Sequence, residues 1–235
     1  MKDRYGREID YLRISITDRC NLRCIYCMPE EGICQTAHKE ILTYDEIRRI
    51  CRCMTVLGIK KIKLTGGEPL TRKDSAVLVR MLKELPGIEK VTLTTNGILL
   101  KEQMAELAEA GIDNINISLD TLNTEAFQKI TRREGLARVL EGLKEAMKYP
   151  RIGLKINCVP VLEDPENLIN LAGIAKDNPI HVRFIEMMPI GYGKEFRFCG
   201  EDEICSVLEE AYGKMTPITE KYGNGPCHYY KISGF

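Results

Sequence analysis

Three cysteines, Cys20, Cys24 and Cys27, lie within eight residues of one another, directly after a strand-like stretch at 11–17. Four cysteine thiolates saturate a four-iron cluster. A set of three would leave one iron free to bind another molecule. The spacing therefore indicates an iron–sulfur cluster with an open iron, at which chemistry can take place.

A zinc site is the alternative for the same residues, because Cys24 and Cys27 have the spacing of a zinc knuckle. Zinc would need a fourth ligand, for which Cys34 and His38 are the nearest candidates, and such sites usually have a second pair downstream. The sequence contains no second pair. The cluster is favoured on this ground, and the zinc site stays open.

A glycine motif, Gly66-Gly67-Glu68-Pro69, follows a second strand-like stretch. Two glycines at a strand end often only form a turn, but they also let the backbone approach a ligand closely. Ser118 ends another expected strand and Met188 follows the last one. Taken alone, such a serine is usually a turn former and such a methionine fills a core or a loop.

The elements that must position these residues are short β-rich stretches alternating with amphipathic helical ones. Strands are expected at 11–17, 60–65, 91–95, 114–119, 154–159 and 181–185, and helices at 44–57, 74–85, 101–110, 135–148 and 166–176. Thr43 and Glu46 have the spacing of a capping box before the first helix.

This alternation predicts an α/β fold with a parallel sheet. Right-handed crossovers would curl the sheet into a partial (β/α)6 TIM-like barrel, open on one side. We expect this barrel at 1–188 and a C-terminal extension at 189–235, with one helix at 201–212 followed by a loop rich in glycine and proline. An antiparallel sheet with one solvated face is the alternative, and the helices between the strands disfavour it.

The strands also alternate between apolar and polar side chains, although strands buried on both faces should be apolar throughout. If the apolar side chains pack against the helices, the polar ones point into the barrel. Arg13, Lys63, Thr94, Lys155 and Arg183 share this polar side. A lumen with several cations would suit an anionic substrate. For Lys155, whose burial without a partner is costly, a structural ion pair is the alternative.

The composition excludes several other classes of function. Lys plus Arg (34) equals Asp plus Glu (34), so no overall charge favours nucleic acid or an anionic membrane. The first residues are too polar for a signal peptide, and no apolar run reaches membrane-spanning length. Ten cysteines in a long, helical chain indicate metal binding or redox work in a reducing cytoplasm rather than disulfides.

The ends of the expected strands gather polar, glycine-rich and sulfur-containing residues at one rim. Barrel enzymes place their sites where strands end and the following loops begin. The cysteine run, the glycine motif, Ser118 and Met188 all follow strands in this way. We therefore expect the site at this rim. The other cysteines show no ligand spacing and are interpreted as small apolar residues.

With these residues assembled, the chain resembles the GTP 3′,8-cyclases, radical S-adenosylmethionine enzymes (lyases) of molybdenum cofactor biosynthesis. The superfamily signature is C-x3-C-x2-C with an aromatic residue before the last cysteine, here Tyr26. The resemblance is colinear over essentially the whole chain, at 6–7, 12–24, 26–30, 64–70, 93–97, 116–120, 183–188 and 225–230. The tracts 12–30 and 183–188 are the more specific ones.

The resemblance implies a role for each matching residue. Cys20, Cys24 and Cys27 would hold a [4Fe–4S] cluster. Tyr26, Gly67, Ser118 and Met188 would bind S-adenosyl-L-methionine. Arg13, Lys63, Thr94 and Lys155 would bind GTP. An arginine is commoner at the position of Lys63, and lysine keeps the charge but loses the bidentate fork, so phosphate contact there should be looser.

The implied reaction converts GTP to (8S)-3′,8-cyclo-7,8-dihydroguanosine 5′-triphosphate through a 5′-deoxyadenosyl radical. An electron donor such as flavodoxin or ferredoxin would reduce the cluster, and cyclic pyranopterin monophosphate synthase would act next in the pathway. No nucleic acid and no membrane partner is expected; a homodimer is left open. The other candidate functions are a radical enzyme acting on another anionic or peptide substrate, and a zinc-stabilised scaffold without catalysis.

The chain departs from the family pattern in one respect. Family members continue for roughly another third and carry three more cysteines for a second [4Fe–4S] cluster, and those ligands are absent from this sequence. We therefore expect the chain to hold the first cluster and S-adenosylmethionine but to cyclise GTP poorly or not at all.

Overall fold

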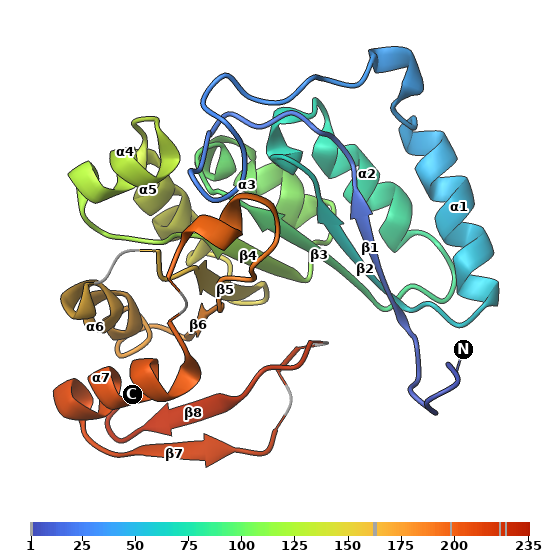
Figure 1. Ribbon diagram of the computed structural model, residues 1–235. Helices are drawn as coiled ribbons and strands as arrows, with labels where there is room; N and C mark the ends of the chain where they lie inside the picture. Colours follow the sequence, from blue (N-terminus) through green and yellow to red (C-terminus); the bar gives the residue numbers. More distant parts are fainter. Residues whose placement is uncertain (1, 162–163, 198, 221, 224) are drawn as a thin grey trace.

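A single six-stranded sheet organises the computed structural model, which describes residues 2–161, 164–197, 199–220, 222–223 and 225–235 (Figure 1). All its strands are parallel and follow one another in chain order, β1-β2-β3-β4-β5-β6. The strands are β1 (Tyr11–Ser15), β2 (Lys61–Thr65), β3 (Lys90–Thr95), β4 (Asn114–Ser118), β5 (Gly153–Cys158) and β6 (Ile180–Phe184). Sequential order with parallel pairing is the topology of a TIM-like barrel.

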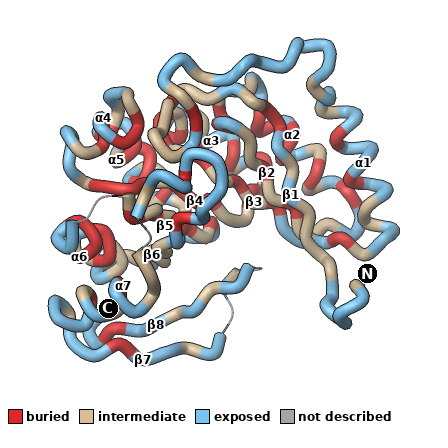
Figure 2. Tube along the Cα trace, viewed as in Figure 1, coloured by how far each residue is buried: buried red, intermediate tan, exposed pale blue. Residues whose placement is uncertain are grey.

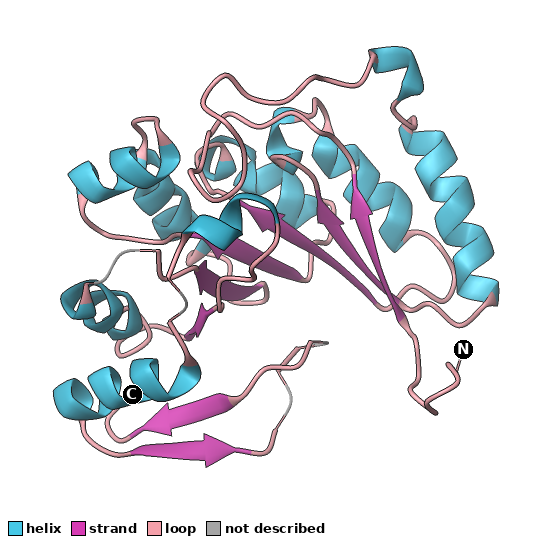
Figure 3. Ribbon diagram, viewed as in Figure 1, coloured by secondary structure: helices cyan, strands magenta, loops and turns pink. Residues whose placement is uncertain are grey.

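Helices connect the strands, as the ribbon coloured by secondary structure shows (Figure 3). They are α1 (Tyr44–Val56), α2 (Ser75–Lys83), α3 (Leu100–Glu109), α4 (Thr124–Thr131), α5 (Leu136–Ala146), α6 (Pro165–Gly173) and α7 (Glu201–Tyr212). The short 3-10 helices are η1 (His38–Glu40), η2 (Pro69–Thr71) and η3 (Gly191–Glu195). In the described part of the chain, no helix is long and apolar enough to cross a membrane.

The alternation of the strands separates a core face from a polar face. Ile62 and Leu64 on β2 and Ile115 and Ile117 on β4 are fully buried. They belong to one apolar cluster with side chains of α1, α2, α3 and α5. The tube coloured by burial shows this buried interior between sheet and helices (Figure 2). The expected packing of the apolar side chains against the helices is confirmed.

The sheet does not close into a full barrel within the described residues. Strand β1 pairs only with β2 and strand β6 only with β5, so both are edges. A complete barrel has eight strands. The predicted partial (β/α)6 barrel, open on one side, is confirmed, and the antiparallel alternative is wrong.

Two parts of the fold differ from the sequence-based expectation. Helix α4 occupies a stretch for which no helix was expected. The segment after α7, expected to be loop, contains an antiparallel hairpin of β7 (Met215–Ile218) and β8 (Tyr229–Ile232). The hairpin packs on α6 and α7 through a second apolar cluster. The boundary at residue 188 stays a prediction.

Candidate functional site

The cysteine run forms a loop that leaves the C-terminal end of β1 and lies against the end of α4. The backbone N–H groups of Arg23 and Ile25 donate to the carbonyls of Thr131 and Ile130, both at 2.9 Å. Within the loop, the N–H of Cys27 donates to the carbonyl of Cys24 at 2.9 Å, forming a tight turn. The loop therefore has a fixed backbone with its cysteines at the strand-end rim.

The three thiols lie close enough to affect one another's ionisation. Burial raises the pKa of Cys24 to about 12, and the neighbouring Asp120, Cys27 and Cys20 raise it further. Burial also raises the pKa of Cys20 and of Cys27. A thiol must lose its proton to bind a metal. Binding at these residues therefore releases protons that the metal-free protein retains at neutral pH.

The donor set at the rim consists of thiols. Three thiols come together at the rim, where Cys27 is exposed and Cys20 and Cys24 are half-buried. Among the described residues, no three His, Cys, Asp or Glu side chains converge closely enough to hold one metal ion. Thiolates are the ligands that hold iron–sulfur clusters. The residues present fit the three-cysteine cluster by their chemistry, and the cluster itself stays a prediction.

The glycine motif brings the end of β2 into direct contact with the start of the cysteine loop. The N–H of Gly67 donates to the carbonyl of Thr17, and that of Glu68 to the carbonyl of Arg19, both at 2.7 Å. A Cβ atom on Gly67 would lie 2.4 Å from the carbonyl oxygen of Arg19. The glycine is needed here for close backbone approach to the loop; its predicted contact with S-adenosylmethionine stays a prediction.

Glu68 is buried and binds the exit of β3 and the start of η2. Its carboxylate accepts from the Thr95 hydroxyl at 2.7 Å, the Asn96 N–H at 2.6 Å and the Leu70 N–H at 3.0 Å. Burial raises its pKa, while these three hydrogen bonds act in the opposite direction. The Asn96 side chain in turn donates to Asn21 Oδ1 at 2.7 Å, next to Cys20.

On the other side of the loop, the Tyr26 hydroxyl donates to Asp120 Oδ2 at 2.6 Å. Asp120 follows β4 and is only 9% exposed. Burial raises its pKa to about 6, although hydrogen bonds from Tyr26 and Val159 lower it. Sequence reasoning gave Asp120 no role. The polar residue directly after a strand was the available signal.

A small cavity joins several of the predicted site residues. Its lining includes Cys24, Tyr26, Ser118, Asn96 and Asp120. Ser118 thus lies at the same cavity as two residues of the cysteine run. Met188 does not belong to this lining; it lies in the loop after β6 and is 64% exposed. The structure therefore brings Tyr26 and Ser118 together, leaves Gly67 at the neighbouring turn and places Met188 in solvent.

The polar face of the sheet carries the predicted cations side by side. Arg13 on β1 is paired in register with Lys63 on β2, and Asn116 on β4 with Lys155 on β5. Burial lowers the pKa of Lys63 to about 8, and the positive charges of Arg183, Arg13 and Lys155 lower it further. These groups repel one another and would all be stabilised by one anion.

Lys155 is itself buried, and burial is the main reason that its pKa falls to about 8. Its ammonium donates to the carbonyl of Tyr222 and lies 5.7 Å from the centre of the Tyr229 ring. No carboxylate of the described residues lies within ion-pair distance, so the structural ion pair considered for Lys155 is not formed there. Thr94 lies on the same face and accepts from the Asn116 amide at 3.3 Å.

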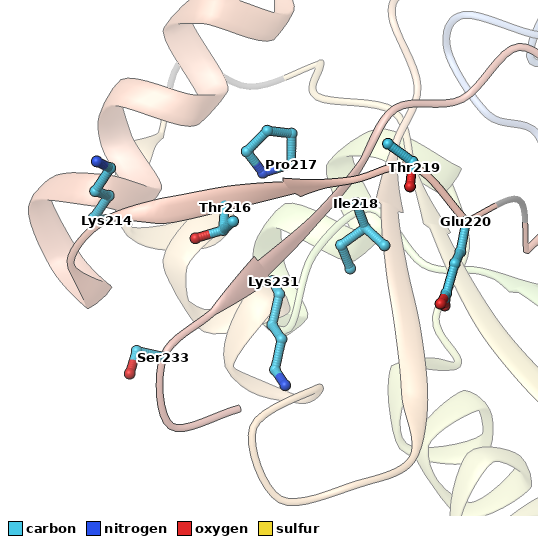
Figure 4. A pocket seen from close by; sticks show the side chains of 8 residues that line it. All are labelled: Lys214, Thr216, Pro217, Ile218, Thr219, Glu220, Lys231 and Ser233. Carbon is cyan, nitrogen blue, oxygen red and sulfur yellow. The ribbon is translucent and has the colours of Figure 1, made fainter.

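A separate hollow lies on the C-terminal hairpin (Figure 4). Its lining is mostly short polar and charged side chains of β7 and β8 and the residues beside them, and it includes none of the predicted site residues. The residues are Lys214, Thr216, Pro217, Ile218, Thr219, Glu220, Lys231 and Ser233. The predicted site residues thus lie elsewhere, at the rim and on the polar face of the larger sheet.

Comparison with known proteins adds independent evidence. The model of the radical SAM superfamily matches residues 14–173. The chain is 43% identical over 236 residues to the GTP 3′,8-cyclase of Pelotomaculum thermopropionicum. The aligned region covers 99% of this chain and 73% of the relative. It is 44% identical over 237 residues to the GTP 3′,8-cyclase of Clostridium perfringens strain 13, with 100% and 73% covered.

Solved structures agree on the fold. Streptococcus suis SuiB bound to the precursor peptide SuiA superposes with a TM-score of 0.69 at 21% identity, covering 86% of this chain and 45% of SuiB. Methylornithine synthase (PylB) superposes with a TM-score of 0.63 at 20% identity, and the superposition covers 85% of this chain and 61% of PylB. Identity this low supports the partial barrel alone. By its matched domain and its curated relatives, the chain belongs to the radical SAM superfamily and, within it, to the GTP 3′,8-cyclase family.

Proposed function

We propose that this protein is a GTP 3′,8-cyclase, which starts the conversion of GTP to 3′,8-cyclo-GTP by radical chemistry. The observation that carries the proposal is the placement of three thiols at the rim of an open barrel whose polar face holds Arg13, Lys63 and Lys155. The relatives with 43% and 44% identity over nearly the whole chain bear the name of this activity.

Cys20, Cys24 and Cys27 would hold the [4Fe–4S] cluster, and Tyr26, Gly67, Ser118 and Met188 would surround S-adenosyl-L-methionine. When bound and reduced, the cluster and S-adenosylmethionine together supply a 5′-deoxyadenosyl radical. The protein contributes placement and exclusion of side reactions. The cavity shared by Cys24, Tyr26 and Ser118 supports this assignment, because it joins a cluster ligand to two of the four residues.

Arg13, Lys63, Thr94 and Lys155 would bind GTP. The three cations carry positive charge that no carboxylate of the described residues neutralises at Lys63 or Lys155, so a triphosphate would replace mutual repulsion by attraction. Thr94 offers a hydroxyl for a polar contact. The proposal includes a one-electron donor such as flavodoxin or ferredoxin, cyclic pyranopterin monophosphate synthase as the next enzyme, and a cytoplasmic location.

Anaerobic reconstitution tests the function directly. The protein is loaded with iron and sulfide, reduced with dithionite, and assayed for 5′-deoxyadenosine and for the cyclised nucleotide, with and without GTP. Measuring the two products separately scores radical initiation and cyclisation independently. Cys27→Ser should abolish 5′-deoxyadenosine formation and, with it, any cyclised nucleotide. Cys53→Ser is the matched control, because Cys53 is an exposed cysteine on α1, away from the loop.

Absence of 5′-deoxyadenosine from reduced, cluster-loaded protein would refute radical initiation. Formation of 5′-deoxyadenosine without any response to GTP would instead favour another anionic or peptide substrate. Stoichiometric zinc in place of iron and sulfide in anaerobically purified protein would favour the non-catalytic scaffold.

A further inference from the structure

The hydrogen bond between Tyr26 and Asp120 joins parts of the chain that lie 94 residues apart. Tyr26 lies between Cys24 and Cys27 in the cysteine turn, whereas Asp120 lies just beyond β4. We propose that Asp120 is a positioning residue, which fixes the Tyr26 ring and, through it, the Cys24–Cys27 turn against the exits of β4 and β5. This goes beyond the predicted contact of Tyr26 with S-adenosylmethionine and rests on the proposed cluster only for its second test.

Asp120 is itself held firmly by the barrel. Its Oδ1 accepts from the Val159 N–H at 2.8 Å, just after β5. Its backbone carbonyl accepts from the Asn167 side chain on α6 at 2.8 Å. One carboxylate oxygen is thus committed to the scaffold and the other to Tyr26. The Tyr26–Asp120 hydrogen bond therefore fixes the loop relative to the sheet.

The energetics indicate that Asp120 is not present for stability alone. A buried carboxylate is costly unless it is paired and hydrogen-bonded. Among the described residues, no Lys, Arg or His side chain forms an ion pair with Asp120. Its carboxylate is instead stabilised by two uncharged hydrogen-bond donors, the Tyr26 hydroxyl and the Val159 N–H. Removing the Tyr26 hydroxyl would leave one oxygen without its donor. The cost is explained if this charge-assisted bond holds the turn in place.

The other anchors close to the Cys24–Cys27 turn do not replace this bond. Arg132 donates through Nη1 to the carbonyls of Arg23 and Met28, at 3.2 and 2.9 Å. These contacts, like those of Arg23 and Ile25 with α4, hold the backbone on the helix side. Tyr26 is the side chain of the Cys24–Cys27 turn that binds the strand side. Without it, the turn keeps its docking to α4 but loses its register to Ser118, which lines the same cavity.

Hydrogen exchange of the metal-free protein provides the first test. The N–H groups of Cys27 and Met28 both donate to the Cys24 carbonyl, and they exchange when the turn opens. Tyr26→Phe removes only the hydroxyl, and we expect both amides to exchange about tenfold faster, since bonds to charged groups are among the stronger ones. Tyr44→Phe, which removes a 2.8 Å hydrogen bond to the Lys73 carbonyl and none to the Cys24–Cys27 turn, should leave them unchanged.

Two substitutions of Asp120 separate position from charge. Asp120→Ala should match Tyr26→Phe, whereas Asp120→Asn keeps one acceptor but loses the charge and should exchange at a rate between those of the wild type and Asp120→Ala. Unchanged exchange in Tyr26→Phe would overturn the proposal, and so would unchanged exchange in Asp120→Ala. If Asp120→Ala fails to fold by circular dichroism, the comparison of Tyr26→Phe with Tyr44→Phe still decides.

A second test uses the cluster-loaded protein. The half-maximal S-adenosylmethionine concentration for the change in the electron paramagnetic resonance signal should rise about tenfold in Tyr26→Phe and not in Tyr44→Phe. An equal concentration in all three proteins would contradict a positioning role. Failure of every protein to take up a cluster would instead count against the proposed function, and the metal-free exchange would still test the Tyr26–Asp120 bond.

Discussion

At the scale of single residues, two buried carboxylates secure the two ends of the cysteine loop. Glu68 binds Asn96, whose side chain reaches Asn21 beside Cys20, and Asp120 binds Tyr26 beside Cys27. Neither carboxylate is a ligand of the predicted cluster. Both place negative charge close to the thiols, since Glu68 raises the pKa of Cys20 and Asp120 that of Cys24.

The close approach at Gly67 leads to the first prediction. In Gly67→Ala, the added Cβ would lie 2.4 Å from the Arg19 carbonyl oxygen, so the loop must shift. We expect a loss of about 1–3 kcal/mol in the free energy of unfolding, measured by urea denaturation, together with weaker iron uptake. Gly225→Ala is the control, because nothing lies within 4 Å of its Cβ position. Equal stability of the two variants would contradict the steric explanation.

The cations of the polar face predict a pH dependence of anion binding. Lys63 and Lys155 have pKa values of about 8, so both lose their protons as the pH rises above 8. The affinity for GTP, measured by calorimetry without reductant, should fall about tenfold or more between pH 7 and 9.5, a change of about 1.4 kcal/mol or more. Arg13 and Arg183 on the same face should preserve residual binding.

Lys63→Met should flatten this profile, and Lys60→Met should not, since Lys60 is paired with Glu89 away from the site. In the ligand-free protein, the free energy of unfolding changes with pH in the opposite direction to the affinity for GTP. Between pH 8 and about 10.5 the unfolded chain binds more protons than the folded one at these lysines, so their contribution to stability rises with pH. An affinity that is constant from pH 7 to 9.5 would rule out these lysines as the anion contacts.

Residue types and spacing predicted the residues of the site better than the hydrogen bonds that hold them in place. The cysteine spacing, the strand parity of Lys63 and Lys155, and Ser118 at a strand end were all readable locally. The Tyr26–Asp120 and Glu68–Asn96 bonds were not, because each depends on residues brought together by strand order. The exposure of Met188 could not be predicted either, since its loop follows no periodic pattern.

At the scale of elements, local capping explains where α1 begins. Thr43 accepts from the Glu46 N–H through its hydroxyl, and the Glu46 carboxylate accepts from the Thr43 N–H at 2.7 Å, as the sequence predicted. Thr43→Ala should cost about 1 kcal/mol, measured as a lower denaturation midpoint. Thr55→Ala, near the C-terminal end of the same helix, serves as a control, and an equal effect there would show that the cap is not responsible.

The elements that the sequence did not predict have identifiable reasons. Strand β7 contains Pro217, and proline within a short run argues against a strand unless it lies at an edge, as it does in this hairpin. Helix α4 is only eight residues long, and its one signal is Asn123, whose side chain accepts from the Ala126 N–H at 2.9 Å. The six regular βα units were predictable because each strand and helix carries its own period.

At the scale of the whole molecule, Phe184 on β6 packs against both apolar clusters. It therefore links the barrel to the unit of α6, α7 and the hairpin. Phe184→Ala should cost about 2 kcal/mol and speed amide exchange in α7, β7 and β8 more than in β2–β4. Phe196→Ala is the control, since Phe196 belongs to neither cluster. Equal acceleration throughout the chain would show a single, undivided cooperative unit.

The open barrel was predictable from the order of its elements, because parallel strands with right-handed crossovers permit few other arrangements. How the C-terminal unit docks was not predictable. Leu168 on α6 meets Ile204 and Leu208 on α7 through tertiary packing, which no local pattern reports. The link between the two clusters at Phe184 likewise appears only once the strand ends are placed in space.

The anchors of the cysteine loop have a consequence for biosynthesis. The hydrogen-bond partner of Tyr26 lies 94 residues further along the chain. Arg132, which binds the carbonyls of Met28 and Arg23, lies 104 and 109 residues after them. At ribosomal speeds of about 5–20 residues per second, those partners are translated on the order of 5–20 s later. The nascent thiols spend that interval unsupported, so the iron and sulfur should be delivered after translation has passed α4.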